Sequence, residues 1–290
     1  MDRRGYFLVA LAACLWGTLG LFFRILHDSF QLSSLTIAFL RAGIAAALLC
    51  TVLALTRREM LRISRRAVAF YLVYGFVGVA AFYFLYVQAV VQTSVTTGVV
   101  LLYTAPAFVT LIAWRVWRES LTPRKLGALA LAFAGCALVA RAYDPAQLRL
   151  NWLGLAFGLG AGFTYALYTV FTKFVLARHS LWTALAYALL FGAVFLAPLQ
   201  NGERLARVAT QPLAWALLLG LAVGPTLGSL TLYNAGLRLV PASNASLVAT
   251  LEPVVGSALA FLVLGERLEG LQLVGGVMVI GGAILVNSQQ

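Results

Sequence analysis

The chain has 290 residues, of which 62% are hydrophobic and only 10% charged, and its mean hydropathy is +0.93. An average soluble domain is about 45–50% apolar and about 25% charged, so this composition excludes an ordinary soluble protein. The net charge of +12 does not indicate nucleic-acid binding, because the basic residues lie in short segments between apolar runs and no compact basic domain is left over.

Apolar runs long enough to cross a bilayer follow one another along the whole chain. A transmembrane helix needs roughly 20 predominantly apolar residues to cross about 30 Å of hydrocarbon. The region 67–114 is too long for one helix, so the nearly uncharged segment from Val91 to Thr93 is interpreted as a break. We therefore predict an all-α polytopic membrane protein with ten transmembrane helices, at residues 6–26, 34–55, 67–90, 94–114, 124–141, 152–176, 181–200, 211–236, 242–264 and 270–287.

Basic residues are distributed unequally between the two sides of this predicted bundle. Cytoplasmic loops of membrane proteins carry an excess of Lys and Arg. If the N-terminus is cytoplasmic, 14 of the 21 Lys and Arg residues lie on the cytoplasmic side, six lie on the outer side, and Arg41 lies within a span. The six on the outer side are Arg24, Arg141, Arg149, Arg204, Arg207 and Arg267. We predict a multi-pass protein of a bacterial inner (plasma) membrane, with both termini in the cytoplasm.

The two halves of the chain resemble each other. Tyr, Pro, Glu and Gly residues match at one offset of 147 positions, and near an offset of 149 the first span aligns with the sixth. The matched pairs are Tyr86 with Tyr233, Pro106 with Pro253, Glu119 with Glu266, Gly135 with Gly282, Trp16 with Tyr165 and Arg24 with Lys173. These matches predict two five-helix repeats, residues 1–145 and residues 146–290.

An odd number of spans in each repeat has a geometric consequence. The second copy enters the membrane from the opposite side, so the two repeats are inverted relative to each other around a central cavity. Inverted repeats are typical of secondary transporters, which bind substrate near the midplane at the repeat interface and work by alternating access. The alternative is an old duplication that is retained only for packing.

Two charged side chains lie in the middle of predicted spans. A buried charge in a membrane costs about 3 kcal/mol or more and usually faces a bundle interior or an aqueous cavity. From the helical rise of 1.5 Å per residue, Arg41 and Glu252 lie within about 5 Å of the same depth. In one interpretation they flank the cavity and bind a zwitterion, Arg41 its carboxylate and Glu252 its ammonium group. In the other, they pair with each other, or with helix-end carbonyls, and hold the second and ninth predicted helices together. Glu252 is also the candidate for proton coupling, because burial favours the protonated carboxyl.

Aromatic residues and prolines complete the predicted site. Trp16, Tyr103 and Tyr165 fall near mid-membrane, away from the interfacial belts in which Trp and Tyr usually lie, and Tyr168 shares the helix face of Tyr165. Tyr83, Tyr86 and Tyr233 lie nearer to helix ends, where an interfacial or gating role is equally plausible, and helix packing is the alternative for every one of these rings. Prolines within spans free backbone carbonyls and bend helices, which predicts hinges at Pro106, Pro225 and Pro253.

Three further polar and small-residue patterns have structural interpretations. Asn234 is a weaker polar candidate for the site. Glu119 and Glu266 lie in short loops beside arginines, where ion pairing or end-capping is favoured over substrate contact. Glycines at four-residue spacing match the small-xxx-small pattern of close helix packing, and they form two rows, Gly154, Gly158 and Gly162, and Gly220, Gly224 and Gly228.

Several short motifs resemble the EamA-type proteins of the drug/metabolite transporter superfamily. The second half contains Tyr233, Pro241-Ala242-Ser243, Leu251-Glu252-Pro253 and Leu264-Gly265-Glu266-Arg267-Leu268, and the first half contains a weaker copy in Trp16-Gly17, Thr104-Ala105-Pro106 and Glu119-Ser120-Leu121. The chain is similar in length and layout to aromatic amino-acid exporters of the YddG type. The resemblance implies ten helices, inverted repeats and export of small metabolites, often amino acids. The first half has Ala105 at the position where the second half has Glu252. A role that needs a carboxylate at this position therefore belongs to the second half alone.

The predicted function is therefore a secondary transporter that exports small metabolites, with neutral and aromatic amino acids as the favoured substrates. Its partners are a small-molecule substrate and the lipid bilayer, not nucleic acid, and a monomer is sufficient. Export of drugs, nucleosides or other metabolites is the alternative within the same class. The absence of a Gly-rich phosphate loop argues against an ATP-driven pump, and the absence of a catalytic constellation in the spans argues against a membrane-embedded enzyme. A channel or a sensory membrane protein is a further alternative. Because the sequence has no His-rich or Cys-rich ligand set, we expect no cofactor and no metal.

Overall fold

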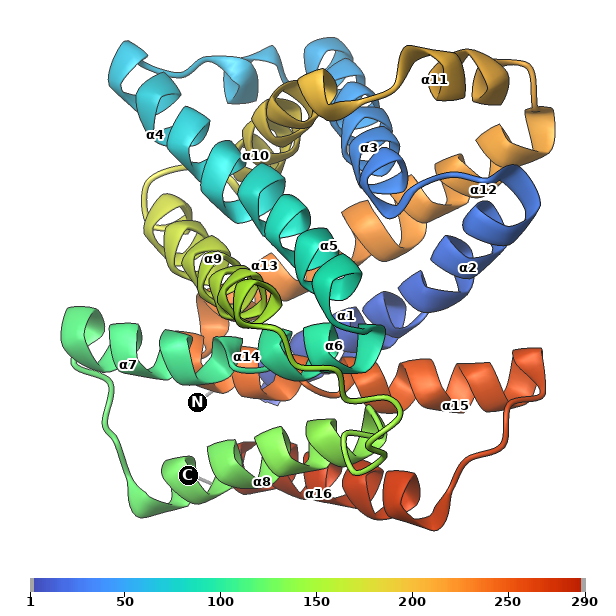
Figure 1. The fold of residues 1–290 in the computed structure, drawn as a ribbon. Helices are drawn as coiled ribbons and strands as arrows, with labels where there is room; N and C mark the ends of the chain where they lie inside the picture. Colours follow the sequence, from blue (N-terminus) through green and yellow to red (C-terminus); the bar gives the residue numbers. More distant parts are fainter. Residues whose placement is uncertain (1–2, 288–290) are drawn as a thin grey trace.

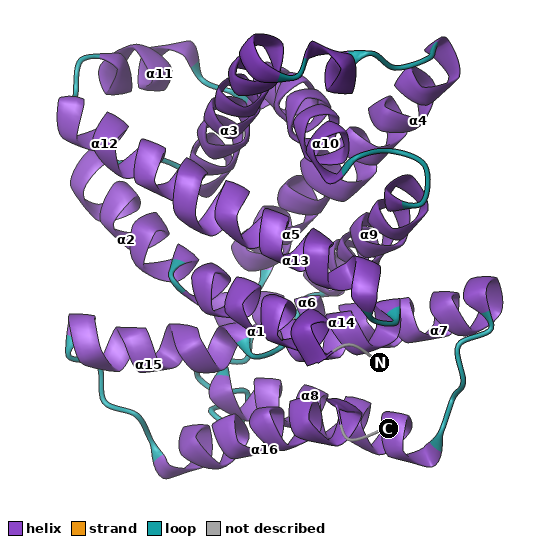
Figure 2. Ribbon diagram, turned by 180° about the vertical axis from the view of Figure 1, so that it is seen from behind, coloured by secondary structure: helices purple, strands orange, loops and turns teal. Residues whose placement is uncertain are grey.

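A computed structural model describes residues 3–287, and the regular structure of these residues is entirely helical (Figures 1 and 2). The predicted all-α class is confirmed. The α-helices are α1 Arg3–Gly17, α2 Leu19–Phe30, α3 Ser34–Thr56, α4 Arg65–Gly75, α5 Phe82–Gln92, α6 Val95–Leu102, α7 Ala105–Trp117, α8 Pro123–Val139, α9 Trp152–Leu176, α10 Leu181–Leu196, α11 Gly202–Ala209, α12 Pro212–Leu221, α13 Ser229–Leu239, α14 Ala242–Ala249, α15 Glu252–Leu264 and α16 Gly270–Asn287.

Consecutive helices join into longer rods that are suited to a bilayer. Within residues 3–287, eight helical segments are long and apolar enough to cross a membrane: 3–30, 34–56, 65–92, 95–117, 152–176, 181–199, 212–239 and 242–264. The helices α8 and α16 occupy the places of the predicted fifth and tenth spans, but they are shorter, with 17 and 18 residues. Ten membrane crossings thus stay a prediction, while a multi-pass helical membrane protein is confirmed.

The segments that connect these rods gather on two faces. We call the face formed by 57–64, 118–122, 177–180 and 240–241 the proximal face, and the face formed by 31–33, 93–94, 140–151 and 265–269 the distal face. Contacts across each face join segments far apart in the sequence. On the proximal face Thr183 donates to the Met60 carbonyl and Arg238 to that of His179; on the distal face Ser94 donates to the Gln147 carbonyl and Arg141 binds Glu269.

The helices α8 and α16, which correspond in the predicted repeat, pack against each other in opposite directions at the lower edge of Figure 1. A Cβ on Gly135 of α8 would lie 2.7 Å from the Gly275 carbonyl oxygen, and a Cβ on Gly282 would lie 3.0 Å from that of Ala128. The contact is thus built on backbone against backbone, as small residues permit between membrane helices. An inverted duplication requires such an antiparallel pair, although the boundary between residues 145 and 146 stays a prediction.

Gly135→Ala should lower the free energy of unfolding of the detergent-purified protein by about 1–3 kcal/mol, because the added methyl group would overlap the backbone of α16. Gly127 lies on the same helix and has nothing within 4 Å of a built Cβ, so Gly127→Ala is the matched control. We expect this control to be neutral or slightly stabilising, since Ala is the better helix former. Equal effects of the two substitutions in a thermal unfolding assay would contradict this account of the contact.

The two predicted glycine rows have different outcomes. Built Cβ atoms on Gly154, Gly158 and Gly162 would lie 2.3–2.6 Å from Thr93, Leu101 and Thr104, so this row does form a close helix contact. The row at Gly220, Gly224 and Gly228 does not form one: Gly224 has nothing within 4 Å of a built Cβ, Gly220 has an ordinary contact with Phe22 at 3.5 Å, and only Gly228 has a tight contact, at 3.3 Å with Leu15 and Val223. The prediction for the second row was wrong, because that segment forms a π-helical turn that changes which side of the helix each glycine faces.

Four rods are interrupted at matching positions of the two halves. The rod α6–α7 breaks at Tyr103-Thr104 and the rod α14–α15 breaks at Thr250-Leu251. The rods α4–α5 and α12–α13 instead contain π-helical segments, Phe76–Ala81 and Ala222–Gly228. Such irregular backbone is tolerated at membrane depth where it lines a cavity or is enclosed by protein.

Candidate functional site

Three of the four interruptions border a cavity in the interior of the bundle, whereas no residue of Ala222–Gly228 lines it. The cavity has a volume of about 750 Å³, within the range of roughly 300–1,000 Å³ that is typical of small-molecule sites. A second cavity of about 350 Å³ shares Trp16 and Glu252 with it and extends between α2 and α15. All the residues that the sequence predicts to bind substrate line one or both cavities: Trp16, Arg41, Tyr83, Tyr86, Tyr103, Tyr165, Tyr168 and Glu252.

Arg41 lies on α3 with only 5% of its surface exposed. The guanidinium carbon is 5.0 Å from the centre of the Tyr83 ring, which is a cation–π contact. The Nε atom has no hydrogen-bond partner among the described residues, and Arg41 forms no ion pair there. A buried, always charged group with unused donors at a cavity wall is suited to binding an anionic group.

Glu252 is the first residue of α15 and follows the break at Thr250-Leu251. The break turns the chain so that the carboxylate contributes to both cavities. Within residues 3–287, no nitrogen of Arg41 lies within 4.0 Å of the Glu252 carboxylate, so the alternative of a structural ion pair between them is not what the structure contains. The two opposite charges, one from each half of the chain, therefore face the same space without neutralising each other directly.

Aromatic rings form most of the remaining wall. Phe82 lies 5.3 Å from Tyr165 and 6.3 Å from Tyr86, measured between ring centres, and it lines the main cavity. Sequence reasoning missed Phe82, although it lies one helical turn before Tyr86 and thus on the same face of α5. The Tyr168 hydroxyl is buried and has no hydrogen-bond partner among the described side chains and backbone. The wall thus combines ring faces with phenolic hydroxyls.

The structure gives two of the predicted aromatic residues specific surroundings. Tyr83 is the second residue of α5, and its ring lies under the Arg41 guanidinium at the main cavity. Tyr233 does not line either cavity: it is 2% exposed, its ring centre lies 5.1 Å from that of Trp16 with the ring planes tilted, and it shares a hydrogen bond of 2.9 Å with Thr169. Asn234 is likewise enclosed, and it does not line either cavity.

The three predicted hinge prolines lie at the helix interruptions. Pro106 and Pro253 are each the second residue of the helix that follows a break, and Pro225 lies inside the π-helical segment Ala222–Gly228. A Pro at the start of a helix has no amide hydrogen to leave unpaired, which is why the rods resume at these positions. A hinge motion at the three prolines stays a prediction.

Both cavities open toward the distal face. The main cavity reaches His27 and Ser34, which flank the distal segment 31–33, and the second cavity reaches Glu266. No residue of the proximal segments 57–64, 118–122, 177–180 and 240–241 contributes to either lining. The structure thus shows a conformation that is open on one side. Within residues 3–287 no cluster of three or more His, Cys, Asp or Glu side chains is placed to hold a metal ion.

A multi-pass helical protein with a charged and aromatic cavity between interrupted helices has the architecture of a membrane transporter. A model of the EamA-like transporter family matches residues 3–141 and again residues 152–288, so the chain belongs to the EamA-like transporter family. It is a membrane transporter of this family, and the resemblance drawn from its motifs is confirmed.

Relatives support the same class. An uncharacterized transporter of Archaeoglobus fulgidus is 30% identical over 98% of this chain and 96% of its own length. A probable terminal-alkyne amino-acid exporter of Streptantibioticus cattleyicolor is 33% identical over 73% of this chain and 71% of its own. A crystal structure with 16% identity superposes with a TM-score of 0.81 over 98% of this chain and 96% of the other, which shows a shared fold.

Proposed function

We propose that this transporter exports neutral amino acids, aromatic ones included, by alternating access. The observation that carries the proposal is that Arg41 and Glu252 face one cavity from opposite halves of the chain and form no ion pair with each other. A zwitterion supplies a partner of opposite charge for each of these two side chains. Other metabolites with a single charge would leave either the guanidinium or the carboxylate without a partner, which is costly in a membrane interior.

Each part of an amino acid has a matching group in the cavity. The planar guanidinium of Arg41 binds a carboxylate in bidentate geometry, and the Glu252 carboxylate accepts hydrogen bonds from an ammonium group. Phe82, Tyr86 and Tyr165 present ring faces to the substrate side chain. The relative named as a probable amino-acid exporter supports this substrate class.

The predicted repeats supply the motion. The helices of the two inverted repeats, residues 1–145 and 146–290, move about the hinges Pro106, Pro225 and Pro253 within them and expose the cavity to each side in turn. One copy of the chain contains the whole pathway. In a bacterial plasma membrane, the excess of basic residues places the proximal face and both termini in the cytoplasm. The termini themselves, residues 1–2 and 288–290, lie outside the described residues.

Counterflow in proteoliposomes tests this function. Purified protein is reconstituted, loaded with unlabelled compound and assayed for uptake of the same labelled compound across amino acids, nucleosides and cationic drugs. We expect trans-stimulated uptake of tryptophan, phenylalanine and leucine, but not of tryptamine or indole-3-propionate, which each lack one of the two charges. Equal transport of either analogue would contradict zwitterion recognition. Uptake without trans-stimulation would indicate a channel, and turnover in detergent would indicate an enzyme.

Phe82→Ala should weaken transport of aromatic amino acids, because an aromatic contact contributes about 0.5–1.5 kcal/mol. We expect the KM for tryptophan to rise about three- to tenfold, while the KM for alanine changes little. Phe84 lies on the same helix but contacts Phe157 instead and does not line the cavities, so Phe84→Ala is the matched control. A parallel rise in KM for both substrates would show that Phe82 acts on the shape of the cavity as a whole.

A further inference from the structure

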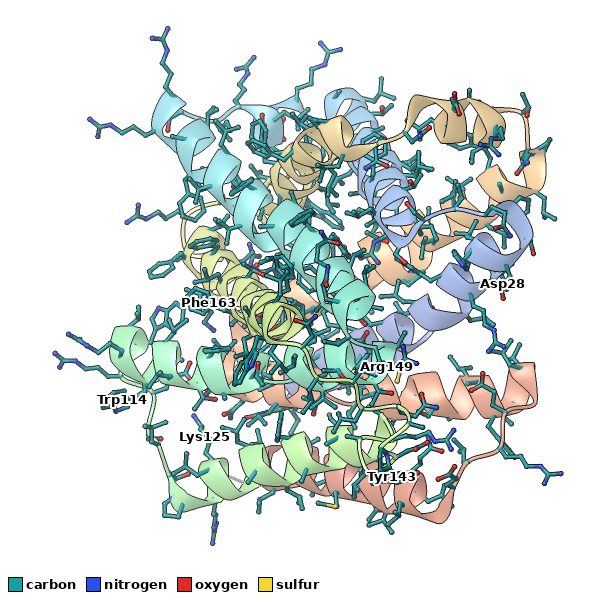
Figure 3. All side chains as sticks on the ribbon, in the orientation of Figure 1. Asp28, Trp114, Lys125, Tyr143, Arg149 and Phe163 are labelled. Carbon is teal, nitrogen blue, oxygen red and sulfur yellow. The ribbon has the colours of Figure 1, made fainter. Side chains whose placement is uncertain are left out.

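The proximal face is closed by a carboxylate that reaches from one half of the chain to the other. Glu119, between α7 and α8, accepts hydrogen bonds from the backbone amides of Ala242 at 2.8 Å and Ser243 at 3.3 Å, and from the Ser243 hydroxyl. The helix α14 begins after Pro241, which provides no side-chain cap of its own, so Glu119 caps it. Lys125, 3% exposed and labelled between α7 and α8 in Figure 3, lies 3.6 Å from the same carboxylate and donates to Ser243.

A second charged side chain binds the other end of the same linker. Lys173 on α9 donates to the carbonyl oxygens of Leu237 at 2.5 Å and Val240 at 2.7 Å, where α13 ends. The linker Val240-Pro241 between α13 and α14 is therefore held from both sides, by a cation on the last carbonyls of one helix and by an anion on the first amides of the next. Both contacts are electrostatically favourable, because the helix dipole attracts a cation at the C-terminus of a helix and an anion at its N-terminus.

The repeat counterparts on the distal face are arranged differently. Glu266 corresponds to Glu119, and Arg24 corresponds to Lys173. Instead of binding the counterpart linker at Thr93-Ser94, Arg24 and Glu266 bind each other, and Arg24 also lies 3.7 Å from Asp28. The first turn of α6 is capped by its own Ser94 side chain. This is the face to which both cavities open.

Local backbone structure does not explain the difference. Arg118 and Gly265, which precede the two glutamates, both adopt left-handed conformations with φ of 54° and 68°. The amides of Glu119 and Glu266 donate to the matching carbonyls of Ala113 and Ala260, at 3.2 and 3.3 Å. The two glutamates thus leave their helices in the same way, and what differs is whether the linker of the other rod is within reach. The partner of each glutamate follows the open or closed state of its face.

We infer that Glu119 and Lys173 form the gate that holds the proximal face closed, and that Glu266 and Arg24 form the equivalent gate of the distal face. In the opposite conformation, Glu266 caps α6 and Arg24 binds the last carbonyls of α5, while Glu119 and Lys173 are released and pair with each other. This inference rests on the proposed alternating access. The four residues act on substrate only through the helices that they hold, so they are positioning residues.

Cysteine accessibility tests the gate without any substrate. Val99 lines both cavities, and its repeat counterpart Ser246 on α14 is 6% exposed behind the closed face. In a background with Cys14, Cys50 and Cys136 replaced by Ala, Val99→Cys and Ser246→Cys are introduced separately, and sealed vesicles of either orientation receive a membrane-impermeant maleimide. We expect Val99→Cys to react from the distal side and Ser246→Cys to be protected.

Glu119→Ala combined with Lys173→Met should raise the labelling of Ser246→Cys from the proximal side about tenfold and lower the labelling of Val99→Cys, since charged hydrogen bonds of the closed state are lost. The matched control, Glu266→Ala with Arg24→Met, should leave Ser246→Cys protected. Thermal unfolding checks that each variant is folded. If the double variant of Glu119 and Lys173 does not fold, the single variants Glu119→Gln and Lys173→Gln are labelled in its place.

Two outcomes would overturn the gate. One is unchanged protection of Ser246→Cys in folded variants of Glu119 and Lys173. The other is an equal rise of labelling in the control, which would show general loosening instead of release of one face. If amino-acid counterflow fails but the cysteine labelling follows the expected pattern, the proposed substrate is overturned and the gate is not. Failure of the proposed function and failure of the gate are therefore distinguishable.

Discussion

Arg41→Gln should reduce the transport rate of neutral amino acids at subsaturating concentration by about 100-fold, because loss of one partner of a buried charged contact costs about 2–5 kcal/mol. Arg41 supplies the unpaired cation at the cavity wall, and Gln leaves no positive charge for a carboxylate. Arg41→Lys keeps the charge but not the planar fork, so we expect an intermediate loss of about tenfold. The measurement is initial uptake in the counterflow assay.

Arg66→Gln is the control for this substitution. Arg66 is exposed on α4, and its replacement changes net charge equally without touching the cavity. We expect transport within twofold of the unmodified protein, as for most surface substitutions. If Arg41→Gln also retained transport within twofold, the carboxylate would be bound elsewhere and the zwitterion model would be wrong.

Glu252→Gln should likewise reduce counterflow of neutral amino acids, by about 30-fold or more, because the neutral amide no longer offers a negative charge to the ammonium group. The charge-exchanged variant with Arg41→Glu and Glu252→Arg separates this role from a structural one. Two residues that served only to pair with each other would tolerate the exchange. Since the structure contains no such pair, we expect the exchanged variant to be as inactive as the single substitutions.

The outcome that would reassign Glu252 is specific. Counterflow needs no net driving force, so a Glu252→Gln protein with normal counterflow that no longer accumulates substrate against a proton gradient would place Glu252 in proton coupling and not in ammonium binding. Recovery of transport in the charge-exchanged variant would contradict both roles and return the two residues to helix packing. Leu259→Ala, which changes a side chain of the second cavity without changing charge, is the control for both variants.

Much of the site was accessible to sequence reasoning because charge is rare inside the spans. Arg41 and Glu252 were identified by the high cost of a buried charge in hydrocarbon, and the structure places both at the main cavity. Phe82 was missed because one more Phe in an apolar run has no signal of its own; only its place on the face of Tyr86 distinguishes it. The surroundings of Tyr83, which lies against Arg41, and of Tyr233, which is enclosed beside Trp16, depend on tertiary packing that linear depth along a helix does not report.

The sequence by itself determined the helical membrane class, the two mid-span charged residues that line the main cavity, Arg41 and Glu252, and the matching positions of the two halves. These follow from composition and spacing, since a bilayer admits only chains that satisfy their own backbone hydrogen bonds. Only the tertiary structure decided that Arg41 and Glu252 are not paired, that one glycine row packs tightly and the other does not, and that Glu119 and Glu266 have different partners. The physical reason is that repeat-matched residues are visible in the sequence, whereas their contacts depend on the side chains that the other half places beside them and on which face of the bundle is closed.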